Sequence, residues 1–282
     1  MDNNMSINQR PKNSRKLCEI DQTQAVIQQL DKLRRSGLLC DVTIVVNGRE
    51  FPAHRAVLAA SGGFFAGLFA SNMQENSQNI VNLGEIDPEV TEDVLTFIYT
   101  GQIELTTENA VAILKAADFL LLETLKSPVD SFLASMCQHI SANPLRSYGI
   151  ALDYKSPLFK TTALDLVCAD FLDVIKSNEF LEISTESIQE IFSSDDLLVN
   201  SEEEVFHALL KWVKHNRGDR EPLFPTLFPL IRSLSEEFLK SVVFSEQLVF
   251  AQPKCLGHVL DCITNEPRPR DCLDREDAVS SN

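Results

Sequence analysis

The spacing of apolar residues predicts an amphipathic helix near the start of the chain. Between residues 22 and 35, apolar side chains recur three or four positions apart, separated by Gln, Asp and Lys. The apolar stripe of this expected helix consists of Val26, Ile27, Leu30 and Leu33. Gly37 follows and is expected to end the helix, because glycine adopts the left-handed conformation at a helix C-terminus at low cost.

A β-hairpin is expected directly after this helix. Residues 42–46 carry valine or isoleucine at every second position, which places those side chains on one face of a strand. Asn47 and Gly48 then accept the positive φ angles that a type I′ turn requires. Residues 49–51 form the expected return strand, and Pro52 fits at its end, where the ladder needs no N–H donor.

More helices and two further short strands, the first of them at residues 80–83, are expected before residue 126. Asp87 precedes a proline and is expected to cap a helix that Gly101 ends. Residues 102–105 form an expected short strand. Thr106 or Thr107 is expected to cap the helix that follows it.

Beyond about Ser127 the pattern is that of helices alone. Ser201 is followed by three glutamates, which is typical of a capping box ahead of a helix. The buried stripe expected for that helix is Val205, Phe206, Leu209, Trp212 and Val213. The sequence thus predicts a flexible arm at 1–21, an α+β domain at 22–126, an all-helical domain at 127–265 and a disordered tail at 266–282.

The chain is strongly acidic, and this charge argues against several classes of partner. Its 282 residues include 25 Lys and Arg against 41 Asp and Glu, a formal net charge of −16. Nucleic-acid binding needs clustered basic residues, and an anionic membrane surface would repel this chain. No stretch offers the roughly 18 apolar residues of a membrane span. We therefore expect neither nucleic acid nor membrane among its partners.

The seven cysteines predict a reducing compartment. Their number is odd, their spacing is wide, and residues 1–16 lack the apolar core of a secretory signal. We therefore expect free thiols in the cytosol or the nucleus. Cys255, His258 and Cys262, with Cys272 further on, could form a zinc site, but their spacing equally suits one packed helix face, which we favour. No metal or cofactor is expected.

No arrangement of residues predicts catalysis. No serine lies in a G-x-S-x-G turn, and the chain has no phosphate-binding P-loop. His54 is more simply explained as a hydrogen-bonding residue at the junction between the hairpin and the next helix. We therefore expect an interaction protein and not an enzyme.

Three separated stretches resemble the BTB–BACK segment of the Kelch-like family. They are LCDVTIVVNGREFPAHRAVLAAS at 39–61, FIYTG at 97–101 and SEEEVFHALLKWVKHN at 201–216. The resemblance extends from about residue 22 to 265. It implies a BTB (POZ) domain at 22–126 followed by a helical BACK domain at 127–265.

The resemblance also implies a dimer. In BTB domains the first helix packs against its two-fold mate, which implicates Val26, Leu30 and Leu33. Asp41 and Arg55 match a charged pair at the base of that interface. The implied partner in the dimer is a second copy of the chain or a BTB relative.

Many family members are adaptors of cullin-3 ubiquitin ligases. Cullin-binding members often carry a hydrophobic residue followed two positions later by glutamate, and Met73 and Glu75 stand at that place. Phe69 and Tyr99 match further positions that face cullin. The 3-box, about residues 127–165, is implied to supply a second cullin contact.

Two functions are open on the sequence alone. In the first, the chain is a substrate adaptor, or part of one, for a cullin-3 ubiquitin ligase. In the second, it is a BTB-mediated scaffold, or a dimerisation partner of Kelch-like relatives, that recruits no cullin. Only 17 residues follow the BACK region, too few for one kelch repeat of roughly 50 residues. The sequence therefore predicts either a partial Kelch-like protein or one without its own recognition module, and the protein substrate is unknown.

Overall fold

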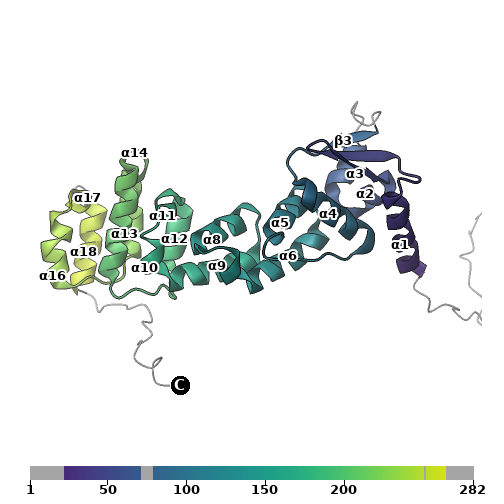
Figure 1. The fold of residues 1–282 in the computed structure, drawn as a ribbon. Coiled ribbons are helices and arrows are strands. Elements are labelled where there is room, and N and C mark those ends of the chain that lie inside the picture. Colours follow the sequence, from purple (N-terminus) through teal and green to yellow (C-terminus); the bar gives the residue numbers. More distant parts are fainter. Residues whose placement is uncertain (1–21, 71–78, 251, 265–282) are drawn as a thin grey trace, which may run out of the picture. The chain divides into compact units, whose positions relative to one another are not determined.

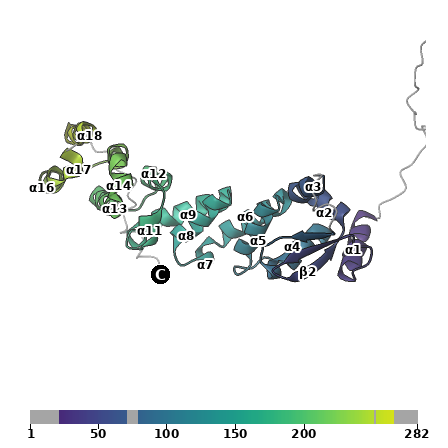
Figure 2. The ribbon, with the colours of Figure 1, turned by 90° about the horizontal axis from the view of Figure 1, so that it is seen from above.

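The chain consists of two compact units (Figures 1 and 2). The computed structural model describes residues 22–70, 79–250 and 252–264. The units divide after Glu104: unit 1 is Met1–Glu104 and unit 2 is Leu105–Asn282. Among the described helices, none combines the length and the apolarity that crossing a membrane requires.

A three-stranded sheet forms the centre of unit 1. Its strands are β1 (Val42–Val46), β2 (Arg49–Ala53) and β3 (Ile80–Asn82), in the order β2-β1-β3. The expected turn joins the antiparallel pair β1 and β2, and Asn47 and Gly48 have φ angles of 48° and 81°. β3 pairs parallel with β1. Because β2 is an edge strand, it tolerates Pro52 inside the strand and continues to Ala53.

The described helices of unit 1 include the two that the sequence predicts, at residues 22–35 and between Asp87 and Gly101. The described helices are α1 (Gln22–Arg35), α2 (Arg55–Ser61), α3 (Gly63–Ala70) and α4 (Pro88–Thr100). After α1, Gly37 has a φ of 71° and the N–H of Leu38 binds the carbonyl of Leu33 at 2.9 Å. The carboxylate of Asp87 caps α4 by accepting the N–H of Glu89 at 2.8 Å.

Two expectations for the segment after α4 are wrong. Residues 102–105 form no strand, because no described strand offers them a hydrogen-bonding ladder. Helix α5 (Ala110–Phe119) begins later than expected, because a turn closes ahead of it. In that turn the N–H of Thr106 binds Oδ1 of Asn109 at 2.8 Å, and the N–H of Asn109 binds Oγ1 of Thr106 at 3.2 Å.

The described part of unit 2 is helical. Its helices are α5, α6 (Glu123–Ser135), α7 (Cys137–Ile140), α8 (Pro144–Asp153), α9 (Pro157–Ala169), α10 (Phe171–Val174), α11 (Glu179–Glu182), α12 (Thr185–Ser193), α13 (Glu202–His215), α14 (Arg217–Arg220), α15 (Phe224–Leu227), α16 (Glu236–Ser241), α17 (Gln247–Phe250) and α18 (Pro253–Thr264). Aromatic side chains hold these short elements together. The ring of Phe171 meets Phe180 and Phe192 edge-on, and the ring of Phe206 does the same with Phe228 and Phe238.

Helix α13 has the expected buried stripe but not the expected capping box. Its stripe residues Val205, Phe206, Leu209, Trp212 and Val213 are all buried. The side chain of Ser201 makes no capping bond, and Glu204 instead accepts the N–H of Asn200 at 2.9 Å. Glu202 is buried and accepts the N–H of Arg232 at 3.0 Å. This glutamate therefore anchors a neighbouring segment and does not belong to a solvated face.

Candidate protein-binding surface

Helix α1 turns Asp31 and Arg34, and not the three apolar residues expected at the dimer interface, toward the rest of unit 1. Asp31 and Arg34 are 8% and 2% exposed where α1 packs against α4. Val26 is 45% exposed, and Leu30 and Leu33 are half-buried. Successive residues turn by about 100° around a helix, so the stripe of these three apolar residues lies about a quarter-turn from the buried side. Val26 and the exposed parts of Leu30 and Leu33 are therefore accessible to a partner.

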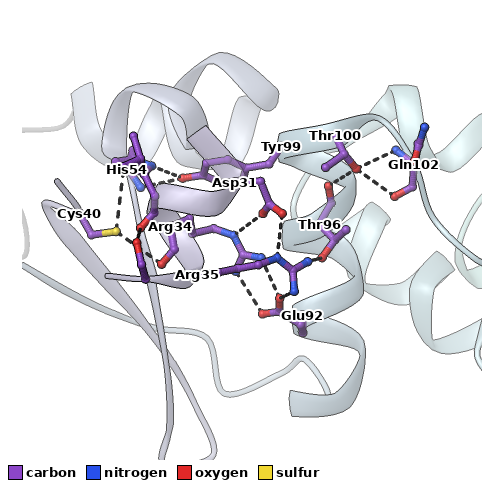
Figure 3. A network of polar contacts seen from close by, with 12 residues as sticks. Asp31, Arg34, Arg35, Cys40, His54, Glu92, Thr96, Tyr99, Thr100 and Gln102 are labelled. Atoms are coloured by element: carbon purple, nitrogen blue, oxygen red, sulfur yellow. Dashed lines mark hydrogen bonds and ion pairs between the residues drawn. The ribbon is translucent and has the colours of Figure 1, made fainter. Parts of the chain in front are cut away.

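Charged side chains hold α1 against α4 (Figure 3). The guanidinium of Arg34 donates to Asp31 at 2.9 Å and to both carboxylate oxygens of Glu92 at 3.1 and 2.7 Å. Arg35 donates to the second oxygen of Asp31 at 2.7 Å and to Oγ1 of Thr96 at 2.9 Å. This paired, bidentate arrangement fixes the rotation of α1 about its own axis.

The same contacts set the protonation of Asp31. Burial disfavours its ionised form, but the hydrogen bonds from Arg35 and Arg34 outweigh burial and hold the pKa of Asp31 below its usual value. The carboxylate is thus ionised at neutral pH. It compensates the positive charge of Arg34, whose guanidinium also lies 5.4 Å from the ring centroid of Tyr99.

His54 joins the hairpin, the end of α1 and α4, as the sequence predicts for a junction residue. Its backbone N–H donates to the hydroxyl of Tyr99 at 2.8 Å, and that hydroxyl lies 2.8 Å from Nδ1 of the imidazole (Figure 3). The hydroxyl can therefore donate to Nδ1, which leaves the imidazole proton on Nε2, 3.3 Å from the carbonyl oxygen of Leu38. Burial raises the pKa of Tyr99 to about 12, so the phenol keeps its proton.

Asp41 and Arg55, the predicted charged pair, contact each other through the backbone. Oδ1 of Asp41 accepts the N–H of Arg55 at 2.7 Å, which satisfies a free donor in the first turn of α2. The guanidinium of Arg55 lies 4.8 Å from the ring centroid of Phe69 on α3. This pair therefore orients α2 and α3 and places a cation over the half-buried phenylalanine.

The structure describes two of the four residues predicted to face cullin. Phe69 is half-buried, near the end of α3. Met73 and Glu75 lie outside the described residues. Tyr99 is 0% exposed, and its hydroxyl is occupied by His54. This burial does not fit the predicted contact of Tyr99 with a partner. The match of Tyr99 to the family position does not determine which way its ring points.

The predicted 3-box region contains a buried carboxylate that the sequence reasoning missed. Asp130 on α6 is 5% exposed and accepts three hydrogen bonds at the start of α9. The donors are the hydroxyl of Ser156 at 2.6 Å and the N–H groups of Leu158 at 3.1 Å and Phe159 at 2.9 Å. Asp130 thus caps α9 from another helix, in place of the adjoining residue that normally does so.

The cysteine and histidine residues near the C-terminus pack in the predicted helix. Cys255 is 0% exposed on α18, and burial raises its pKa to about 11. His258 lies with Nε2 2.9 Å from the carbonyl oxygen of Ile231 and 3.6 Å from the sulfur of Cys262. Cys272 lies outside the described residues, and the described ones include no group of three or more His, Cys, Asp or Glu placed to hold a metal.

Two family models match the chain in sequence order. The BTB/POZ domain model matches residues 30–136, and the BACK model, "BTB And C-terminal Kelch", matches residues 145–244. The chain is a BTB–BACK protein of the Kelch-like family. The expected fold class, an α+β BTB domain followed by a helical BACK domain, is confirmed.

Similar proteins include several Kelch-like proteins. Kelch-like protein 7 of Rattus norvegicus is 32% identical over 238 residues, which cover 82% of this chain and 39% of that protein. Kelch-like protein 17 of Homo sapiens is 33% identical over 258 residues, which cover 86% of this chain and 40% of that protein. The BTB–BACK chain thus spans about 40% of the length of these relatives.

A solved structure also resembles part of the BTB–BACK chain. The BTB domain of zebrafish PATZ1 is 29% identical, with a TM-score of 0.37, and the match covers 40% of this chain and 92% of that one.

Proposed function

We propose that the chain is a dimeric adaptor that binds cullin-3 through its BTB domain and thereby contributes to a ubiquitin ligase. The observation that carries the proposal is the accessible apolar stripe of α1 in a chain that belongs to the Kelch-like family. The proposed role is positional, so no residue performs chemistry. The cytosol or the nucleus is the proposed compartment.

The two sides of α1 differ in a way that supports a dimer. The polar side is already satisfied within unit 1, because Asp31 and Arg34 are paired and buried. The apolar side still exposes Val26, and the chain after α1 exposes Leu38 at 58% and Leu39 at 79%. A two-fold partner would cover this surface with the same surface of a second chain, which is the usual geometry of a homodimer.

Cullin binding is argued from the segment that begins at α3. The half-buried Phe69 lies under the Arg55 guanidinium, and Met73 and Glu75 follow shortly after α3 ends. An aromatic ring, a methionine and a carboxylate within seven residues suit an apolar anchor with a charged rim. In a dimer, two such sites would hold two cullins, which raises the effective concentration of ligase at one target.

Calorimetry of the chain against the N-terminal domain of cullin-3 tests the proposal. We expect saturable binding that is weakened at least tenfold by Met73→Ala and by Glu75→Ala. Phe250→Ala is the matched control, because this phenylalanine is 60% exposed in unit 2 and should leave the affinity unchanged. Absence of binding from a folded dimer would refute the adaptor role and leave the scaffold, or a dimerisation partner of Kelch-like relatives, as the function.

A further inference from the structure

The exposed residues of helix α13 are all lysine or histidine. They are His207, Lys211, Lys214 and His215. Because successive residues turn by about 100° around a helix, these four positions lie within about 100° of one another. Helix α13 therefore presents one face of lysine and histidine to the solvent, in a chain whose formal net charge is −16.

The positive charge of this part of the chain is a local exception. Residues 207–220 contain four lysine or arginine residues and one aspartate, a net charge of +3. Lys211 donates to a neutral group, the carbonyl oxygen of Ile175, at 2.6 Å. This bond fixes the position of the ammonium group without neutralising its charge.

Two exposed phenylalanines lie beside this face. Lys214 donates to Oε2 of Glu246 at 2.8 Å, which brings η4 (Val243–Ser245) and α17 next to α13 (Figures 1 and 2). Phe244 and Phe250 flank Glu246 in the sequence, and their ring centroids are 6.4 Å apart. The two side chains are 38% and 60% exposed. Exposed aromatic residues with charged neighbours are typical of protein-binding surfaces.

We name Lys211, Lys214, Phe244 and Phe250 the α13 surface. None of these four residues belongs to the proposed dimer contacts or to residues 127–165, the implied second contact with cullin. The lysines determine which partner fits the aromatic pair, because an acidic partner is attracted to them and a basic one is repelled.

We propose that the α13 surface binds an acidic segment of a partner protein that also carries apolar side chains. The apolar side chains would lie against Phe244 and Phe250. Aspartate or glutamate residues beside them would approach Lys211 and would compete with Glu246 for Lys214. The acidic remainder of the chain would repel such a segment, so its charge directs it to this surface.

Fluorescence anisotropy with synthetic peptides tests the proposal on the full chain. The probe is a panel of labelled dodecapeptides in which two leucines lie three or four positions apart among aspartate and glutamate. Each peptide has a mate in which serine replaces both leucines. We expect saturable binding of at least one acidic peptide and at least tenfold weaker binding of its mate.

Two outcomes of this experiment would overturn the proposal. Equal binding of the serine mates would show that the phenylalanines hold no apolar anchor. Absence of saturable binding by every acidic peptide would leave a second copy of the chain, or its own residues 265–282, as the occupant of the α13 surface.

Charge reversal tests the lysines. The double variant Lys211→Glu with Lys214→Glu should lower the affinity for the acidic peptide at least tenfold. Lys115→Glu with Lys155→Glu is the matched control, because it makes the same change of net charge at two exposed lysines elsewhere in unit 2 and should lower the affinity less than threefold. Circular dichroism verifies that each variant is folded. Equal losses in the two double variants would show that overall charge governs binding and would overturn the proposal.

Removal of one ring tests the aromatic pair. Phe250→Ala should lower the affinity for the acidic peptide at least fivefold. Leu158→Ala is the control, because this leucine is 54% exposed in unit 2 and lies outside the α13 surface. An unchanged affinity in Phe250→Ala would overturn the proposed site. Because Phe250→Ala should leave the affinity for cullin-3 unchanged, this proposal and the proposed function fail separately.

Discussion

Replacing Arg34 by methionine should strongly weaken the attachment of α1 to α4. Its side chain is 2% exposed and donates three hydrogen bonds to Asp31 and Glu92. Removing one partner of a buried ion pair costs about 3–5 kcal/mol, because the other charge is left uncompensated. Arg35 still reaches both carboxylates, at 2.7 and 3.3 Å, which lowers the expected cost to about 2–3 kcal/mol.

Arg35→Met is the matched control, because the same chemical change is made at the next residue and affects the same two carboxylates. The Arg35 side chain is 50% exposed, and exposed ion pairs contribute about 0–1 kcal/mol. Hydrogen exchange of the amides of α4 measures the difference. Arg34→Met should raise the exchange rate of the slowest α4 amides by about 30- to 140-fold, and Arg35→Met should raise it by less than about sixfold. Equal effects of the two variants would refute the argument from burial.

Three further predictions follow from other contacts. Asp130→Ala should destabilise unit 2 by about 2–3 kcal/mol, because it removes the cap of α9. Trp212 fluorescence should then show unfolding at a lower urea concentration. Asp173→Ala is the control and should have little effect, because its ion pair is exposed. Tyr99→Phe should destabilise unit 1 by about 1–3 kcal/mol, because it leaves the N–H and Nδ1 of His54 unpaired. Hydrogen exchange of the β1 and β2 amides measures this, and an unchanged exchange rate would contradict it. Folding lowers the pKa of Asp31, so the contribution of Asp31 to the stability of unit 1 is complete above the usual carboxyl pKa and is lost as the pH falls below about 4. Asp31→Asn should therefore make the stability of unit 1 less dependent on pH in acid. An unchanged dependence on pH would refute this.

Local patterns predicted most of the elements of the fold. The alternation in residues 42–46 and the Asn47-Gly48 turn gave the hairpin, and Gly37 and Gly101 gave the ends of α1 and α4. These signals are strong because they depend only on neighbouring residues. The expected strand at 102–105 failed for the opposite reason, since a strand exists only where another strand pairs with it.

Contacts between distant segments could not be predicted in the same way. The spacing of Asp31, Arg34 and Arg35 indicates ion pairs along one helix, but nothing in the sequence identifies Glu92 as their common partner. Asp130 is another example, because its partners at the start of α9 follow it by more than 25 residues. The family resemblance supplied candidate positions such as Tyr99, but a matched position does not determine whether a side chain is exposed.

The mass of the complex between this chain and the N-terminal domain of cullin-3 tests the central claim most directly. Light scattering coupled to gel filtration should give twice 31.6 kDa for the chain alone. On saturation the complex should contain two copies of each protein, and Leu30→Glu should reduce it to one copy of each. A monomeric wild-type chain, or a dimer whose mass does not change when cullin is added, would contradict the account.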